Sequence, residues 1–212
     1  MNNRNRSVSL ICLILIVVVG VDCKFLKFSS GGGGVNESAA PVDTVKAAYK
    51  TVQDARFYQA TSTSTNSLGT IVTTTVYNAP DRFWTKNAGT NFIGEVIVAG
   101  DDSYSRANGG KWTKVTSGQA LKASDMKPYD LFAASVSNVE SAGKETMNGK
   151  DSLIYKFNSS YGGEAIAKMW VEKSSGLPLR VESVGSYTGT SVAITMTYDF
   201  EHETKVETPD VE

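Results

Sequence analysis

The sequence predicts a mainly β protein of the α+β class, built on a strongly curved antiparallel sheet that forms a half-barrel with two or so helices as a lid. From Arg56 onward, apolar and polar residues alternate with a period of two, as in strands with one covered face. Turn residues separate these segments at 108–110, 148–149 and 174–176. Only two segments have helical spacing. A sheet of about nine or more strands must curl or split, and two helices cover only part of it.

The N-terminal segment is distinct from this domain. Two arginines precede an uncharged apolar run over residues 10–21, and Cys23 follows closely. A basic start, a short apolar run and a following cysteine are typical of an export signal, and the run is shorter than the roughly 20 residues that span a bilayer. We therefore expect residues 1–22 to be a signal peptide.

Cys23 is the predicted point of lipid attachment, and residues 23–40 are predicted to be the anchor region and a flexible tether. Four consecutive glycines at 31–34 support the tether, because glycine-rich segments are flexible. Two alternatives remain, an uncleaved single-helix anchor and ordinary signal cleavage nearby. The expected location is the cell envelope, on a membrane and facing the periplasm or the extracellular side.

Composition excludes several classes of function. With 21 basic and 22 acidic residues, the chain has a net charge of −1 and no excess of positive charge for nucleic acid. Both cysteines, Cys12 and Cys23, precede the body, and His202 is the only histidine. No disulfide framework, thiolate metal site or His-rich metal site is therefore expected. No set of nucleophile, base and metal is apparent, so we predict no catalytic residues, no metal, no cofactor and no enzyme activity.

Residues 35–57 contain the clearest helical pattern. Apolar residues there recur at spacings of three, four and three, namely at Val42, Val45, Tyr49 and Val52. Pro41 suits the first turn of such a helix. A second, shorter helix is predicted over residues 128–134, where Leu131 and Phe132 supply the apolar face.

Strands are predicted along the rest of the chain, and the late ones alternate most clearly. Threonine- and valine-rich residues 70–77 have high β-propensity. Further strands are expected near 82–85, 92–99, 104–106 and 111–115. The apolar faces of the late strands carry Met169, Leu179, Val181, Val192, Ile194 and Met196. Together with the turns, this pattern predicts a concave apolar interior, which is where hydrophobic ligands bind.

Five segments resemble the bacterial lipoprotein-carrier superfamily, the LolA-like and LppX-type proteins of the cell envelope. They match in order and spacing, at 77–84, 95–105, 109–112, 143–149 and 169–180. The resemblance implies a curved antiparallel sheet closed by a helical lid around a lipid-sized cavity. LolA-type carriers have an arginine where this chain has Ala79, and they lack an anchor cysteine. These departures favour the anchored LppX-type relatives.

The resemblance also suggests roles for residues. The six apolar side chains of the late strands would line the cavity, and four others would form the lid or the cavity mouth: Phe132, Leu131, Trp84 and Trp112. For each of them the alternative is an ordinary packed core.

The sequence therefore predicts an exported, membrane-tethered binding protein that holds a lipid or acyl group, for lipid or lipoprotein transport. Its expected partners are a lipid or an acylated protein, and a membrane through the N-terminus. Residues 41–203 would form the half-barrel domain and 204–212 a tail. The alternative is an envelope protein-interaction or sensor module with the same fold and no bound lipid.

Overall fold

The computed structural model describes residues 34–115, 121–187 and 190–211. The predicted signal peptide, Cys23 and most of the predicted tether lie outside the described residues. The fold below is that of the compact unit that ends at Glu212.

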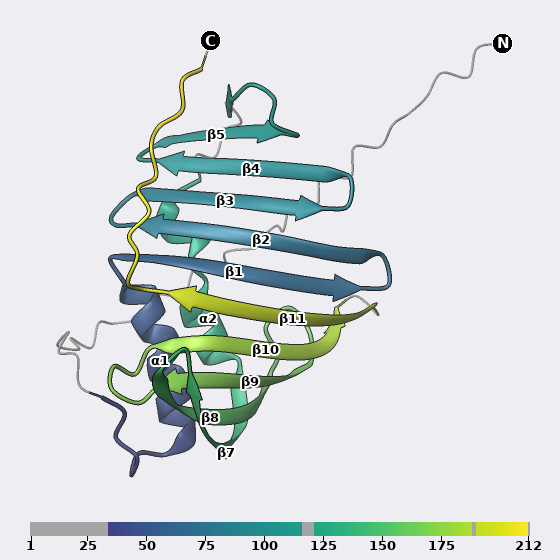
Figure 1. The fold of residues 1–212 in the computed structure, drawn as a ribbon. Coiled ribbons are helices and arrows are strands. Elements are labelled where there is room, and N and C mark those ends of the chain that lie inside the picture. Colours follow the sequence, from purple (N-terminus) through teal and green to yellow (C-terminus); the bar gives the residue numbers. More distant parts are fainter. Residues whose placement is uncertain (1–33, 116–120, 188–189, 212) are drawn as a thin grey trace. The chain divides into compact units, whose positions relative to one another are not determined.

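Eleven antiparallel strands form one open sheet, which confirms the predicted fold class (Figure 1). Their order is β6-β5-β4-β3-β2-β1-β11-β10-β9-β8-β7, so β6 and β7 are the edges. The strands are β1 (Phe57–Asn66), β2 (Gly69–Asn78), β3 (Arg82–Gly89), β4 (Phe92–Ala99), β5 (Asp102–Ala107), β6 (Thr113–Lys114), β7 (Val136–Met147), β8 (Lys150–Ser159), β9 (Ala165–Glu172), β10 (Pro178–Tyr187) and β11 (Thr190–Asp199).

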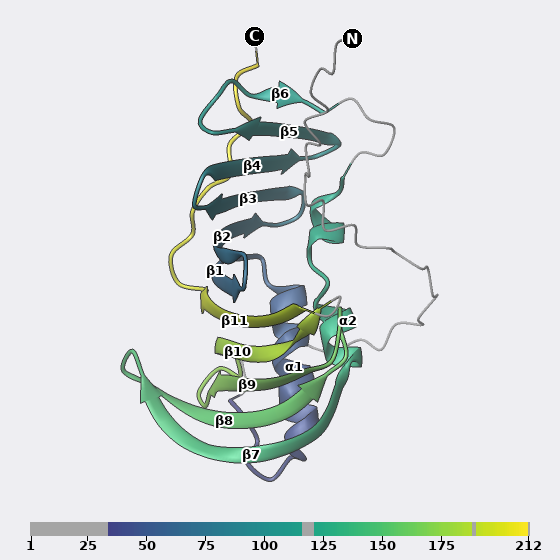
Figure 2. The ribbon, with the colours of Figure 1, turned by 90° about the vertical axis from the view of Figure 1, so that its right-hand side faces the viewer.

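Three helical segments pack on one face of this sheet. They are α1 (Pro41–Asp54), the 3₁₀ helix η1 (Ala123–Met126) and α2 (Tyr129–Ala134), which confirms both predicted helices. The apolar stripe of α1 is buried, with Val45 and Val52 completely covered. Strands β7 to β9 curve around α1 (Figure 2).

The predicted turns have the geometry that their residues favour. Asn148 and Gly149 have φ angles of 52° and 78° and join β7 to β8. Two positive φ angles in succession match the right-handed twist of the flanking strands. Asn108 and Gly109 likewise have φ angles of 50° and 70°.

The sheet has an inner face, which carries the helices, and an outer face. Inner-face residues of neighbouring strands stand opposite one another, as in the row Tyr58, Tyr77, Phe83 and Val98 of β1 to β4. These residues join α1 in one core cluster. A second cluster lies on the outer face and consists of Val76, Ile97, Tyr104 and Val206, with Trp84, Ala99 and Trp112 beside it.

Segments on both sides of residues 41–203 also pack against the domain. The Val35 N–H donates to the Lys173 carbonyl at 2.8 Å, and Glu37 forms ion pairs with Lys144 and Lys173. In the C-terminal segment, the Val206 N–H donates to Asn78 Oδ1 at 2.8 Å. Within the described residues, the helices are all too short or too polar to cross a membrane.

Candidate functional site

Aromatic rings fill the space between the helices and the inner face. Tyr129 of α2 is at the centre, with ring centroids of Tyr49, Tyr58, Phe132 and Tyr198 at 5.5–6.5 Å. We call the full set the ring cluster: Tyr49, Tyr58, Tyr77, Tyr129, Phe132, Phe157, Tyr161, Tyr198 and Phe200. Offset and edge-to-face contacts of this kind stabilise beyond the apolar area they bury.

The hydroxyl groups of Tyr58 and Tyr198 interact with that of Tyr129 inside the ring cluster. The Tyr77 O–H donates to the Pro80 carbonyl at 3.4 Å. Burial raises the pKa of the three interacting phenols above the ordinary value, and it also raises the pKa of Tyr49. The reason is that a phenolate in this apolar surrounding loses its hydration.

Alkaline pH is therefore expected to unfold the protein. Tyrosines ionise near pH 10 in the unfolded chain and only at higher pH in the fold. The folded state thus keeps protons that the unfolded state has lost, and stability falls as pH rises above about 10. Denaturant unfolding at a series of pH values above 10 measures this loss of stability. In Tyr129→Phe, stability should fall less steeply with pH. Ionisation of Tyr58, Tyr129 and Tyr198 near pH 10 with the fold intact would contradict this expectation.

Lys127 connects the segment between η1 and α2 to the end of α1. Its ammonium donates to the carbonyls of Gln53 and Ala55 and lies 3.9 Å from the ring centroid of Tyr77. A cation is favoured there because unpaired carbonyls at a helix C-terminus carry partial negative charge. Desolvation lowers the pKa of Lys127 to about 8.

The structure places the six predicted cavity residues differently from one another. Met169, Val181 and Met196 form a row across β9, β10 and β11. Met169 is completely buried, while Val181 and Met196 are partly buried against the core. Val192 and Ile194 continue the inner face of β11 and are only partly buried.

Leu179 lies at an irregularity in the sheet. The register between β9 and β10 shifts between Pro178 and Arg180, so Leu179 has no direct partner on β9. It is partly buried.

The two predicted lid residues on α2 point in different directions. Phe132 belongs to the ring cluster and makes an edge-to-face contact with Tyr161 at 4.5 Å. Leu131 is 47% exposed. The covering role of α2 thus depends on Tyr129 and Phe132, and the sequence indicated only the second.

Trp84 and Trp112 lie on the outer face, so the structure does not bring them together with Phe132. Trp84 stands opposite Val76 and Ile97, and its Nε1–H donates to Glu95 at 3.2 Å. Trp112 lies under the guanidinium of Arg106, 4.5 Å from the ring centroid. Period-two alternation explains this placement, because Phe83 takes the inner position and the next residue must face outward.

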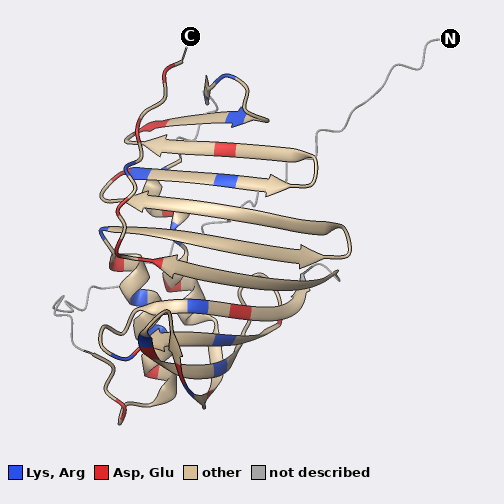
Figure 3. Cartoon of the chain, viewed as in Figure 1, with Lys and Arg blue, Asp and Glu red and all other residues tan. Residues whose placement is uncertain are grey.

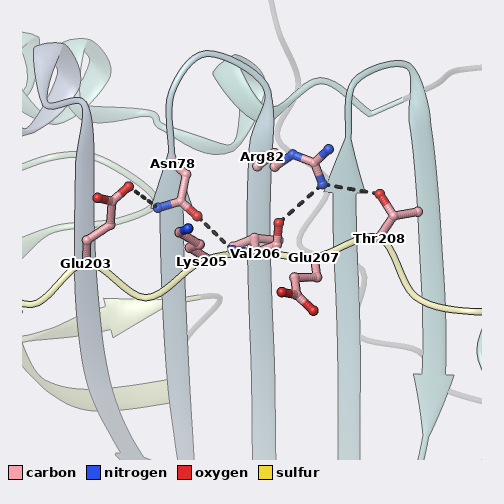
Figure 4. A pocket seen from close by; sticks show the side chains of 7 residues that line it. All are labelled: Asn78, Arg82, Glu203, Lys205, Val206, Glu207 and Thr208. Carbon is pink, nitrogen blue, oxygen red and sulfur yellow. Dashed lines mark hydrogen bonds between the residues drawn. The ribbon is translucent and has the colours of Figure 1, made fainter.

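Two of the pockets in the described part of the chain lie beside the C-terminal segment, and the predicted cavity residues line neither. The larger, of about 370 Å³, lies where this segment crosses the ends of the strands (Figure 4). Arg82 Nη1 there donates to the Val206 carbonyl and to Thr208 Oγ1, both at 3.2 Å. The second, of about 200 Å³, is lined by Arg56, Phe57, Ala79 and Glu203. The polar groups of the larger pocket hold the C-terminal segment in place.

Metal chemistry has no support in the part of the chain that the structure describes. No group of three or more His, Cys, Asp or Glu side chains there is placed to hold a metal ion. Asp102 instead pairs with Lys114 at 2.7 Å, and Gly100 before it has a φ of 63°, as in a turn.

Comparison with known proteins gives structural neighbours only. No family model and no curated protein matches the chain. LprF from Mycobacterium bovis is similar over 74% of this chain and 91% of its own, at 13% identity and a TM-score of 0.52. The lipoprotein LppX from Mycobacterium tuberculosis is similar over 74% and 92%, at 14% identity and a TM-score of 0.49. The chain has the LolA-like fold, so the resemblance is confirmed at the level of the fold.

Proposed function

We propose that the protein is a membrane-tethered binding protein of the cell envelope that holds a lipid or acyl group against the inner face of the half-barrel. The observation that carries this proposal is the inner face of β11 beyond the ring cluster. Val192, Ile194 and Met196 occupy successive inner-face positions there and are partly exposed. This stretch of β11 contains no charged residues.

Small side chains flank this apolar row. Ile194 stands opposite Ser64 of β1 and Ser183 of β10, and Val192 stands opposite Gly185. Such residues project little from the sheet, so they leave room beside the larger aliphatic groups. An acyl chain lying there loses contact with water along its length, and each buried methylene contributes about 0.8 kcal/mol.

A second candidate is an interaction or sensor module that binds no lipid. One observation favours it, the complete burial of Met169 beside a ring cluster that occupies the space under the helices. In this case the protein's own side chains take the place of a ligand. Native mass spectrometry of the full chain, gently extracted from membranes, separates the two, because only the first candidate retains a lipid.

Phe132→Ala is expected to reduce the amount of lipid that stays bound more than it reduces stability. Phe132 joins α2 to Tyr49 and Tyr161 through ring contacts, so its loss frees α2 to move away from the inner face. Because the side chain is only partly buried, the stability loss should be below the roughly 3–5 kcal/mol of a fully buried phenylalanine. Lipid content and denaturant melts are measured together, with Leu131→Ala as the control. Equal proportional losses would make Phe132 an ordinary core residue.

Cys23→Ser is expected to release the protein from membranes. Under this proposal acyl chains on Cys23 supply the attachment energy, and the apolar run before it is removed. The measurement is the share of protein that sediments with membranes at high salt. If the serine variant still sediments, the attachment is an uncleaved helix and the lipoprotein hypothesis is wrong.

A further inference from the structure

Two hairpins end side by side at one end of the sheet. The turns that join β1 to β2 and β3 to β4 lie at this end (Figure 1). A Cβ placed on Gly69 of the first would lie 4.0 Å from Oγ1 of Thr90 in the second, and one placed on Gly89 would lie 3.9 Å from Ile71. The two turns are therefore in contact.

Large apolar side chains are exposed at this end, and the ring of Phe92 lies over Gly94. Leu68 is 92% exposed, Phe92 53% and Ile71 48%. We call the whole set the tip surface: Leu68, Ile71, Val72, Phe92 and Ile93. Ile71 and Phe92 lie on the inner face and Val72 and Ile93 on the outer face, so the set surrounds the tip on both sides of the sheet. Single exposed apolar residues are ordinary, but a group gathered at one end of a sheet marks an interaction site.

The backbone holds the tip surface in this exposed arrangement. The Leu68 N–H donates to Asn66 Oδ1 at 2.8 Å. Asn108 forms two hydrogen bonds with the backbone of Ile93. The Asn108 N–H donates to the Ile93 carbonyl at 2.7 Å, and Asn108 Oδ1 accepts from the Ile93 N–H at 2.8 Å. These hydrogen bonds fix the backbone at Leu68 and Ile93.

Charged residues are absent from the two hairpins and from the adjoining ends of β10 and β11, while Lys111 and Glu164 lie elsewhere at this end of the sheet. Residues 57–78, 87–94 and 183–198, which supply β1 and β2 and the adjoining ends of β3, β4, β10 and β11, contain no Asp, Glu, Lys or Arg. Figure 3 shows the charges of β3, β4, β10 and β11 on the middles or the opposite ends of these four strands. Thr65, Asn66 and Thr70 surround the apolar groups with uncharged hydrogen-bonding groups instead.

We propose that the tip surface docks into the surface of a lipid bilayer. Exposed apolar groups at the ends of hairpins can enter a soft surface, whereas a protein partner would need a matching hollow. Desolvation of charged side chains is the largest free-energy penalty for entering a membrane. The residues that flank the tip surface are uncharged, so this penalty is absent. Hydroxyl and amide groups around the tip suit the interfacial layer, where water and headgroups supply hydrogen-bonding partners.

The chain between Cys23 and Gly34 is long enough for the tip surface to reach the membrane to which Cys23 would be attached. Gly34 lies beside the Lys173 and Ser174 carbonyls, at the end of β10 away from the tip surface. Strand β10 has 10 residues, which is about 33 Å at the usual rise per residue. Fully extended, the chain from Cys23 to Gly34 reaches about 40 Å. A chain attached at Cys23 can therefore bring the tip surface to the same membrane. The inference rests on the proposed attachment and not on the proposed lipid site.

Tryptophan fluorescence in the full chain tests the proposal. Leu68→Trp is reconstituted in phosphatidylcholine vesicles whose acyl chains carry bromine, and its quenching is compared with that of wild type, which corrects for the three native tryptophans. Val211→Trp is the exposed control in the C-terminal segment. We expect strong, salt-insensitive quenching for the first and little for the second. Adding Phe92→Ser and Ile93→Ser should remove most of the quenching, while adding Ile166→Ser and Val184→Ser, an exposed pair on the outer face, should not.

Three outcomes would overturn the proposal. Equal quenching of Leu68→Trp and Val211→Trp in vesicle-bound protein would mean that the tip surface does not meet lipid. Self-association that the Phe92→Ser and Ile93→Ser changes abolish, without quenching, would assign the surface to a second copy of the chain. Flotation of the same samples detects unbound protein, which would overturn both the docking and the attachment. Loss of the co-purified lipid alone, with quenching retained, would leave the docking supported and remove only the proposed lipid site.

Discussion

Replacing Tyr129 by alanine is expected to lower the free energy of unfolding by about 3–5 kcal/mol, the usual cost of truncating a buried aromatic side chain. Tyr129 is 5% exposed, and its ring touches rings from α1, β1, β11 and its own helix. The change also removes the buried hydroxyl that interacts with those of Tyr58 and Tyr198. Denaturant unfolding of the full chain measures the loss.

Leu131→Ala is the matched control, two residues further along α2. Its side chain is 47% exposed, so the variant should stay within about 0.5 kcal/mol of wild type. Similar, small losses in both variants would mean that α2 is only loosely held and that the ring cluster does not stabilise the fold. A large loss for Tyr129 alone would show that the cluster is a packed core and not a lining.

Periodicity predicted those elements whose faces differ in polarity. Helix α1 was recognisable because Val45, Tyr49 and Val52 share one stripe, and the β7–β8 hairpin because Asn148 and Gly149 favour positive φ. Strand β1 gave no such signal. Its Gln-Ala-Thr-Ser-Thr-Ser-Thr-Asn sequence places short polar groups on both faces, and pairing with β2 and β11 along its length decides its conformation.

The candidate site was harder to predict, because side-chain direction depends on register. Trp84 and Phe83 are both large aromatic residues, and only the pairing of β3 with β2 and β4 directs Trp84 outward. Leu179 appeared to continue the alternation through Val181, but the register shift beside it interrupts that pattern. Lys127 gave no signal in the sequence, since the carbonyls that it binds, at the end of α1, are more than 70 positions earlier.

Nor could the ring cluster be recognised as a unit. Tyr58, Phe157 and Tyr198 are far apart in the sequence, and each occupies an alternate position of a different strand. What brings them together is the strand order, in which β11 lies between β1 and β10. That order also leaves the apolar row of β11 next to two serines, and this is the feature that the lipid hypothesis needs.

Ile194→Trp is the variant that separates a lipid-binding face from a packed one. Ile194 is partly exposed on the inner face and stands opposite Ser64 and Ser183, so an indole should fit over these small groups. If the row holds a lipid, the indole takes its place, and we expect bound lipid to disappear while the melting temperature hardly changes. If instead the side chains pack tightly against one another, the extra volume should cost about 1–3 kcal/mol.

Ala193→Trp supplies the comparison for this variant, because the preceding residue of β11 faces outward and is exposed. It introduces the same indole into the same strand without entering the inner face, so both lipid content and stability should match wild type. Each protein is assayed by native mass spectrometry and by thermal melting. Loss of lipid in Ile194→Trp alone, at unchanged stability, would locate the ligand beside the serines of β1 and β10. A destabilised Ile194→Trp, together with a wild type that never yields lipid, would favour the interaction module, because the inner face would then be filled by the protein's own side chains.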